Sequence, residues 1–430
     1  MNRKLVPHHS NWGAFNAVVE DGKVVGAVPF ELDPDPSPLI DGIADAVHSP
    51  TRIPCPMVRA GWLKDGRTSG QGRGREPFVR VTWERAIDLV AGELARVRRE
   101  YGPSGIMGGS QGWSSAGHFY EARGQLRRFL AASGGFVDQT SNYSFGTALT
   151  FLPHILGSAQ AVTGPLTSWS SIALNTRLFV MFGGANPKNT QVAKGGCAWH
   201  GTSGAFAALA RAGVRVINVS PIRDDGPDAI GPEWIAIRPN TDTAMMLALA
   251  HTLLTERRHD EAFLTRYCNG FPRVLPYLTG AADSQPKDTA WAAAITGVPA
   301  ETIRKLARQM AATRTMLTAS WSLQRADHGE QPYWRWCCSR HASARSDCRA
   351  ADLASVMARA HAWPSRRCSF PARRCRRCPI PRSLPYPPRA SRTACCAPAS
   401  ATTTTATARL IWISAWSTGP AAIRSTTIKT

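Results

Sequence analysis

The sequence predicts an α/β protein with a doubly wound parallel sheet, followed by a disordered tail. Strand-like and helix-like segments alternate from about residue 177, as in sheets built from strand–helix–strand units. Glycine and proline fall at the expected turns between these segments. After Arg335 the composition changes abruptly, and the later residues have neither a hydrophobic period nor turn glycines.

Short elements are expected before the sheet. Residues 15–30 alternate around Asp21-Gly22, which predicts a hairpin. Proline and glycine punctuate residues 33–76, which predicts a winding segment with few strands. Thr82 is the expected N-cap of a helix that Gly102-Pro103 ends. One apolar face of this helix is expected at Ile87, Val90, Ala91 and Leu94.

A second helix is expected over about residues 120–132, before Gly134-Gly135. The sheet strands are then expected at residues 178–182, 214–219 and 234–237. A helix over roughly residues 202–212 separates the first two strands. Asn240-Thr241-Asp242 is expected to cap a further helix that carries Met245, Met246, Leu249 and Leu253.

Polar residues follow each of the three expected strands. Asn186 follows the first strand, Ser220 the second, and Asn240 and Asp242 the third. Parallel sheets bind ligands at the carboxyl ends of their strands, where turns present N–H groups to phosphates. These residues are therefore candidates for a ligand site, and the alternative is that they only form turns and caps.

The chain after Arg335 has a separate character. These 95 residues hold one of the 36 glycines, two of the 30 acidic residues and eight of the 11 cysteines. They also carry +14 of the net charge of +21, so the high pI is mostly a property of this segment. A segment so basic and so poor in aliphatic residues is expected to be disordered.

A change of reading frame near Arg335 would explain this break. Joining the last base of each codon to the first two of the next turns Trp336-Cys337-Cys338 into an optional Met, then Val and Leu. Continued through Met357, the genetic code permits MVLLAACLGQIGLPGGGLGFGYG, an apolar helix followed by a glycine-rich loop. We therefore expect residues 336–430 to be an out-of-frame basic tail. A natural basic tail that binds nucleic acid or membrane is the alternative.

The rest of the chain limits the cofactor and the compartment. Cys55, Cys197 and Cys268 lie far apart and form no CxxC pair, so no iron–sulfur cluster is expected. No apolar run approaches the length of a membrane span. The start lacks an export signal, which predicts a cytoplasmic protein, or a periplasmic one if the true start lies upstream.

Several motifs, in this order and spacing, resemble the dimethyl sulfoxide reductase family of molybdopterin enzymes. The branch of trimethylamine N-oxide, dimethyl sulfoxide and biotin sulfoxide reductases is the most similar. The resemblance covers about residues 5–334 and resumes in the shifted frame. The motifs are Phe78-Val-Arg-Val-Thr-Trp-Glu84, Gly109-Ser-Gln-Gly-Trp113, Ser141-Asn-Tyr-Ser-Phe-Gly146, Thr167-Ser-Trp169, Ala185-Asn-Pro187, Arg238-Pro-Asn-Thr-Asp242, Trp321-Ser-Leu-Gln-Arg325 and Gly329-Glu-Gln331.

The resemblance implies roles for three residues near the metal. Ser144 falls where this branch supplies a serine alkoxide to molybdenum, a hard oxygen ligand suited to a high-valent metal. Trp113 corresponds to the tryptophan whose indole N–H faces the metal's oxo group. Gln111 stands where relatives often have a tyrosine that donates to this group, so the substrate preference is open. Without the resemblance, Ser144 would be expected to cap a helix and Trp113 to lie in a core.

The resemblance also implies a cofactor, molybdenum bis(molybdopterin guanine dinucleotide). Asn186, Ser220, Asn240 and Asp242 would hold the guanosine end of one dinucleotide, although relatives usually have aspartate where Ser220 stands. The pterin or the diphosphate would face a second set of residues, Ser322, Gln324 and Arg325.

The implied organisation has four parts. Residues 1–60 form a β-containing segment, 61–160 part of an α/β molybdenum-site domain, 161–335 a Rossmann-like dinucleotide domain, and 336–430 the tail. Together they make a partial multi-domain molybdopterin oxidoreductase fold. The implied reaction is oxygen-atom transfer from a small S-oxide or N-oxide, with electrons from an external donor protein. The truncated chain is expected to be inactive, and a non-enzymatic basic nucleic-acid-binding protein is the alternative.

Overall fold

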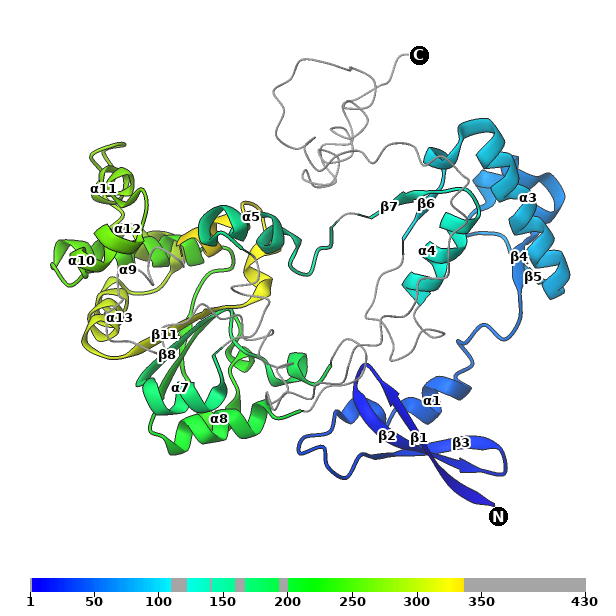
Figure 1. The fold of residues 1–430 in the computed structure, drawn as a ribbon, viewed down its shortest axis with the longest axis horizontal. Coiled ribbons are helices and arrows are strands. Elements are labelled where there is room, and N and C mark those ends of the chain that lie inside the picture. Colours follow the sequence, from blue (N-terminus) through cyan, green and yellow to red (C-terminus); the bar gives the residue numbers. More distant parts are fainter. Residues whose placement is uncertain (1, 110–121, 140, 159–166, 193–199, 336–430) are drawn as a thin grey trace. The chain divides into compact units, whose positions relative to one another are not determined.

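A computed structural model describes residues 2–109, 122–139, 141–158, 167–192 and 200–335 of the chain (Figure 1). Gln111, Trp113 and the expected tail at residues 336–430 lie outside the described residues. Within them, no helix is long and apolar enough to cross a membrane.

The chain begins with an antiparallel sheet in the order β1-β2-β3. Its strands are β1 (Arg3–Ser10), β2 (Gly13–Glu20) and β3 (Lys23–Pro29). The predicted hairpin at residues 15–30 is confirmed, and the sequence analysis missed β1. Short elements follow, as predicted for the winding segment, namely η1 (Pro38–Ile40), α1 (Ile43–His48), β4 (Met57–Arg59), α2 (Ala60–Asp65) and η2 (Gly66–Gly72).

The next part of the chain contains two helices and short strands. These elements are β5 (Phe78–Arg80), α3 (Trp83–Tyr101), η3 (Pro103–Gly105), β6 (Met107–Gly108), α4 (Ala122–Ala132) and β7 (Val137–Asp138). The predicted cap is confirmed, because Thr82 Oγ1 accepts a hydrogen bond of 3.2 Å from the Arg85 N–H. The apolar face expected on α3 is not covered by the described residues, because no residue of α3 is buried and Ile87 is 61% exposed.

Four parallel strands form the main sheet, in the order β10-β9-β8-β11. They are β8 (Leu178–Phe182), β9 (Arg215–Ser220), β10 (Glu233–Ala236) and β11 (Thr315–Ala319). The three predicted strands are confirmed. The sequence analysis missed β11, a short segment with no glycine or proline beside it.

Helices cover both faces of this sheet (Figure 1). Phe179 and Met181 point to one face, where they pack with Phe206 of α8, and Val180 and Phe182 point to the other. The doubly wound arrangement is therefore confirmed. One face is covered by α7 (Trp169–Asn175) and α8 (Thr202–Arg211), and the other by α5 (Gly146–Leu156), α9 (Asp242–Thr255), α12 (Thr289–Thr296) and α13 (Ala300–Ala312).

Peripheral helices and turns complete this part of the chain. The helix α11 (Phe271–Thr279) packs on α9 through Leu278, and it follows α10 (Glu261–Tyr267). The turns that follow the strands include η4 (Pro187–Thr190), η6 (Arg223–Asp225), η7 (Asp228–Ile230) and η8 (Trp321–Gln324).

Candidate active site and dinucleotide site

The sheet order creates a point where the chain reverses its winding direction. Strands β8, β9 and β10 progress one way across the sheet, whereas β11 lies on the other side of β8. Ligands of open parallel sheets bind outside the carboxyl ends of the strands at such a point. Gly183 lies there with φ of 76°, and a Cβ added to it would lie 2.9 Å from Ser320 Cβ. The chain therefore needs glycine where the segments after β8 and β11 meet.

The ends of β8 and β9 are joined by one hydrogen-bonded group. Asn186 Nδ2 donates to Asp225 Oδ1 at 3.4 Å, and Ser220 Oγ donates to Asp225 Oδ2 at 2.8 Å. The structure thus brings the predicted residues Asn186 and Ser220 together through Asp225. Our sequence analysis did not select Asp225, because its place at this edge depends on the path of the chain after β9.

The end of β10 presents an unsatisfied carboxylate. Asp242 is the first residue of α9 and is 3% exposed, and its Oδ1 has no hydrogen-bond partner among the described residues. Burial raises the pKa of Asp242 to about 6, against a partly opposing effect of a backbone hydrogen bond. The helix begins where predicted, but no side chain caps it. The carboxylate is therefore available to accept hydrogen bonds from a ligand.

Asn240 and the residues after β11 lie close together. Asn240 has φ of 62°, and its Nδ2 donates to the Asp327 carbonyl at 3.4 Å. Ser322 is exposed, and its Oγ lies 2.6 Å from Ser320 Oγ. Arg325 is exposed too. The predicted dinucleotide residues other than Gln324 therefore lie at the carboxyl edge of the sheet. Two of them, Asn186 and Ser220, form hydrogen bonds to Asp225 there.

Gln324 has a different environment, because its side chain is buried and holds the segment of Ser144. Its Oε1 accepts a hydrogen bond of 2.8 Å from the Ala148 N–H, and its Nε2 donates to the Ser144 carbonyl at 2.8 Å. Nε2 also lies 3.2 Å from the Trp321 carbonyl. The structure therefore places the backbone of Ser144 directly beside the segment after β11.

Ser144 itself is exposed in a turn before α5. Asn142 Oδ1 accepts from the Phe145 N–H at 2.9 Å and closes this turn. The N-cap of α5 is Phe145, and no side chain caps the helix. The alternative that Ser144 caps a helix is therefore wrong, and its hydroxyl is free to meet a ligand at the surface of the turn.

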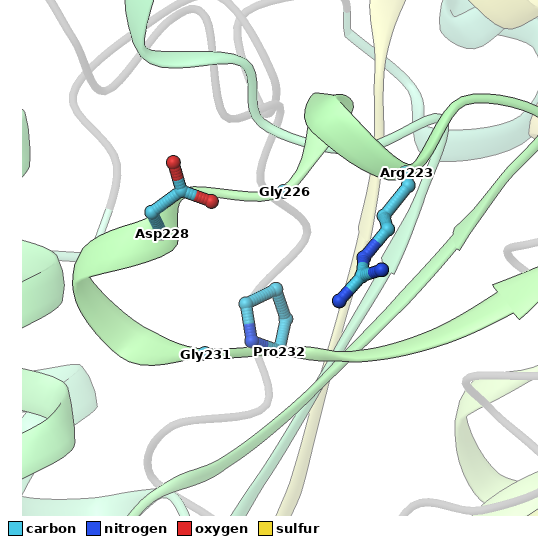
Figure 2. Close-up of a pocket in the computed structure, with 5 residues that line it drawn as sticks. All are labelled: Arg223, Gly226, Asp228, Gly231 and Pro232. Carbon is cyan, nitrogen blue, oxygen red and sulfur yellow. The ribbon is translucent and has the colours of Figure 1, made fainter.

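A pocket of about 190 Å³ lies just after Asp225 (Figure 2). It is lined by Arg223, Gly226, Asp228, Gly231 and Pro232, with Arg223 and Asp228 on two of its sides. Ligand pockets usually measure about 300–1,000 Å³, so this one has room for only part of a nucleotide. Within the described residues, no cluster of three or more His, Cys, Asp or Glu side chains could hold a metal.

Comparison with known families agrees with this arrangement. Residues 52–337 match the molybdopterin oxidoreductase family, and residues 8–48 match the molybdopterin oxidoreductase N-terminal domain. The chain therefore belongs to the molybdopterin oxidoreductase family.

Three individual relatives show which members of the family the chain is similar to. The chain is 43% identical over 330 residues to a dimethyl sulfoxide/trimethylamine N-oxide reductase of Rhodobacter capsulatus, covering 76% of this chain and 39% of the relative. It is 45% identical over 311 residues to a biotin sulfoxide reductase of Cereibacter sphaeroides, covering 72% and 42%. It is 44% identical over 335 residues to trimethylamine-N-oxide reductase 1 of Escherichia coli K12, covering 76% and 39%. The chain thus spans about two fifths of the length of these relatives.

Among solved structures, acetylene hydratase from Pelobacter acetylenicus is similar in fold. The TM-score is 0.54 at 20% identity, and the match covers 81% of this chain and 44% of that one. This similarity concerns the fold alone.

Proposed function

We propose that the chain derives from a molybdenum-dependent S-oxide or N-oxide reductase. The names of the relatives supply the substrate class, since they include dimethyl sulfoxide, trimethylamine N-oxide and biotin sulfoxide reductases. The observation that carries the proposal is the position of Ser144, an exposed hydroxyl whose backbone is tied to the edge of a parallel sheet. A metal ligand beside a dinucleotide edge is the arrangement that such a cofactor requires.

The free carboxylate of Asp242 supports a guanine dinucleotide as the form of the cofactor. A guanine base offers adjacent N–H donors, and a carboxylate with an unpaired buried oxygen is a matching acceptor. The amide of Asn240 lies two residues away. The turn at Gly183 lets the segments after β8 and β11 approach closely, and backbone N–H groups of such turns would bind a phosphate. Arg325 supplies an exposed positive charge for the diphosphate.

Ser144 would supply an alkoxide oxygen to the metal. Bound molybdenum supplies the two-electron chemistry that removes oxygen from an S-oxide or N-oxide. The chain's contribution is to hold Ser144 in one place, which Gln324 and Asn142 do through hydrogen bonds to the turn. Gln324 is thus proposed to position the metal ligand rather than to contact the pterin. Trp113 and Gln111 remain proposed donors near the metal.

We also propose that the present chain is an inactive, truncated product of a frame change near Arg335. Its electrons would otherwise come from an external donor protein, since the sequence suggests no iron–sulfur cluster. One side of a cofactor site cannot enclose a cofactor that several domains normally surround. The 430-residue chain should therefore purify with essentially no molybdenum.

The test uses a gene in which the frame near codon 335 is restored. The restored protein should contain molybdenum and reduce S-oxides or N-oxides with an artificial electron donor. Ser144→Ala should keep the pterin but lose most turnover, because a metal ligand is lost. Ser141→Ala, on the same exposed segment, is the matched control. Full activity of Ser144→Ala would remove this residue from the site, and stoichiometric molybdenum in the 430-residue chain would overturn the truncation proposal.

A further inference from the structure

The polar side chain that a ligand can reach after β9 is that of Asp225, and not that of Ser220, the residue selected from the sequence. Ser220 is fully buried at 0% exposure. Its hydroxyl proton is directed to Asp225 Oδ2 at 2.8 Å, and its oxygen accepts from the Ile222 N–H at 3.2 Å. A hydroxyl has a single proton to donate, so Ser220 has none left for a ligand.

Asp225 is better placed for contact with a ligand. Its side chain is only partly buried, and its carboxylate is held from two directions by Ser220 and Asn186. An ionised carboxylate has about four acceptor positions, so these two hydrogen bonds leave others open. The two donors also fix the direction in which the remaining positions point.

The backbone around Asp225 packs closely against the turn that follows β8. Gly184 has φ of 70°, and a Cβ there would lie 2.5 Å from Asp225 Cβ. The Ala185 N–H donates to the Asp225 carbonyl at 2.7 Å. These close contacts hold η6 against the turn after β8, so the carboxylate lies between the ends of two neighbouring strands.

We propose that Asp225 accepts hydrogen bonds from the ribose 2′- and 3′-hydroxyls of the bound nucleotide. Ser220 and Asn186 are then positioning residues that orient this carboxylate. In parallel dinucleotide-binding sheets, the ribose hydroxyls are bound by an acidic side chain near the end of the second strand, and β9 is the second strand of this sheet along the chain. The inference rests on the proposed guanine dinucleotide site and names the residue that binds its sugar.

Neighbouring acids do not offer the same geometry. Asp224 is exposed, and its backbone carbonyl oxygen, rather than its carboxylate, accepts a hydrogen bond of 3.3 Å from Asn186 Nδ2. Asp228 is also exposed and lines the pocket of Figure 2. Asp225 alone among these three acids has a carboxylate fixed by two side-chain donors. Asp224 is therefore a matched control with the same charge.

The test measures binding of GDP and of 2′,3′-dideoxy-GDP to the 430-residue chain by calorimetry. The wild-type chain should bind GDP about 10- to 100-fold more tightly, because hydrogen bonds to a charged group contribute about 1.5–3 kcal/mol. Asp225→Asn should remove this preference without changing affinity for the dideoxy nucleotide. Asp224→Asn should retain the preference, and Ser220→Ala should reduce it, since the carboxylate is less well oriented.

The outcomes distinguish the proposed role of Asp225 from the proposed guanine dinucleotide site on which it rests. Equal GDP preference in the wild type and in Asp225→Asn would overturn the role of Asp225 while leaving the guanine site intact. Absence of any GDP binding to the wild-type chain would overturn both. If Asp225→Asn does not fold, the wild type and Ser220→Ala still decide, because an unchanged preference in Ser220→Ala contradicts the proposed orientation.

Discussion

The four-stranded parallel sheet and the region around α3 contain similar elements but differ in burial. Every residue of β8 is buried, and α9 is buried along most of its length. No residue of β4, β5 or α3 is buried, and Trp83 is 67% exposed. The sheet of β8 to β11 has helices on both faces, whereas β6 and β7 form a parallel pair of two residues each. The first region has its own core, whereas no core cluster is found among the described residues around α3.

The difference shows that an amphipathic pattern predicts a helix more securely than it predicts burial. The sequence of α3 carries an apolar row and a good N-cap, yet the row has no partner in the described part of the chain. Parallel strands are normally covered on both faces, which takes a further layer of structure. The relatives are more than twice as long as the matched segment.

The largest expected difference between the two regions is in hydrogen exchange. Amides of β8, β9 and α9 should exchange about 1,000-fold or more slowly than those of α3 and α4, because a buried layer opens only with a large part of the fold. Mass spectrometry of peptides from the 430-residue chain measures this. Equal protection in α3 and α9 would show that the α3 region has a partner layer after all.

Core substitutions should show the same contrast in stability. Phe182→Ala should lower the free energy of unfolding of the sheet region by about 3–5 kcal/mol, because it removes a fully buried side chain. Ile87→Ala, at a position 61% exposed, should change it by less than about 0.5 kcal/mol. Urea denaturation followed by the circular dichroism signal makes the comparison. A large effect of Ile87→Ala would reveal that this side chain is buried in solution.

Asp242 should make the sheet region less stable as the pH rises. Its pKa is about 6 in the folded chain against 3.8 for the ordinary group, so folding favours the protonated form. Its stability contribution is present below about pH 4 and lost as the pH rises through 6. Asp242→Asn should therefore stabilise the chain at pH 7 by about 1–3 kcal/mol and have little effect at pH 4. Thermal melts at the two pH values test this, and a destabilised variant at pH 7 would indicate that the carboxylate is satisfied.

The smallest expected effect is at the cap of α3. Thr82→Ala removes the hydrogen bond to the Arg85 N–H and should cost α3 about 1 kcal/mol locally. The denaturation midpoint of the sheet region should not move, because that region has a separate core. Thr82→Ser, which keeps the acceptor, is the control. A shift of the sheet midpoint in the alanine variant alone would show that the two regions unfold together.

The elements found from the sequence are those fixed by local patterns. The strand at β8, the cap at Thr82 and the start of α9 at Asp242 each follow from a few neighbouring residues. β11 was missed because its place depends on pairing with the distant strand β8. The exposure of α3 could not be found from its sequence for the same reason, since the burial of a helix face depends on a non-local partner.

The candidate site also combines residues that local sequence reveals with residues that only distant contacts place there. Asn240 and Asp242 could be selected because they follow a predicted strand. Asp225 could not, because only the close approach of η6 to Gly184 brings it to the edge. The contact of Gln324 with Ser144 joins residues far apart in sequence, and only the fold reveals it.

The central claim is that the carboxyl edge of the four-stranded sheet binds a guanine nucleotide. Hydrogen exchange of the 430-residue chain with saturating GDP, and with ADP as the control, tests this most directly. Slower exchange with GDP is expected in peptides that cover residues 183–187, 220–226 and 238–243, with no change in residues 57–109. An equal response to ADP, or protection confined to residues 57–109, would contradict the account.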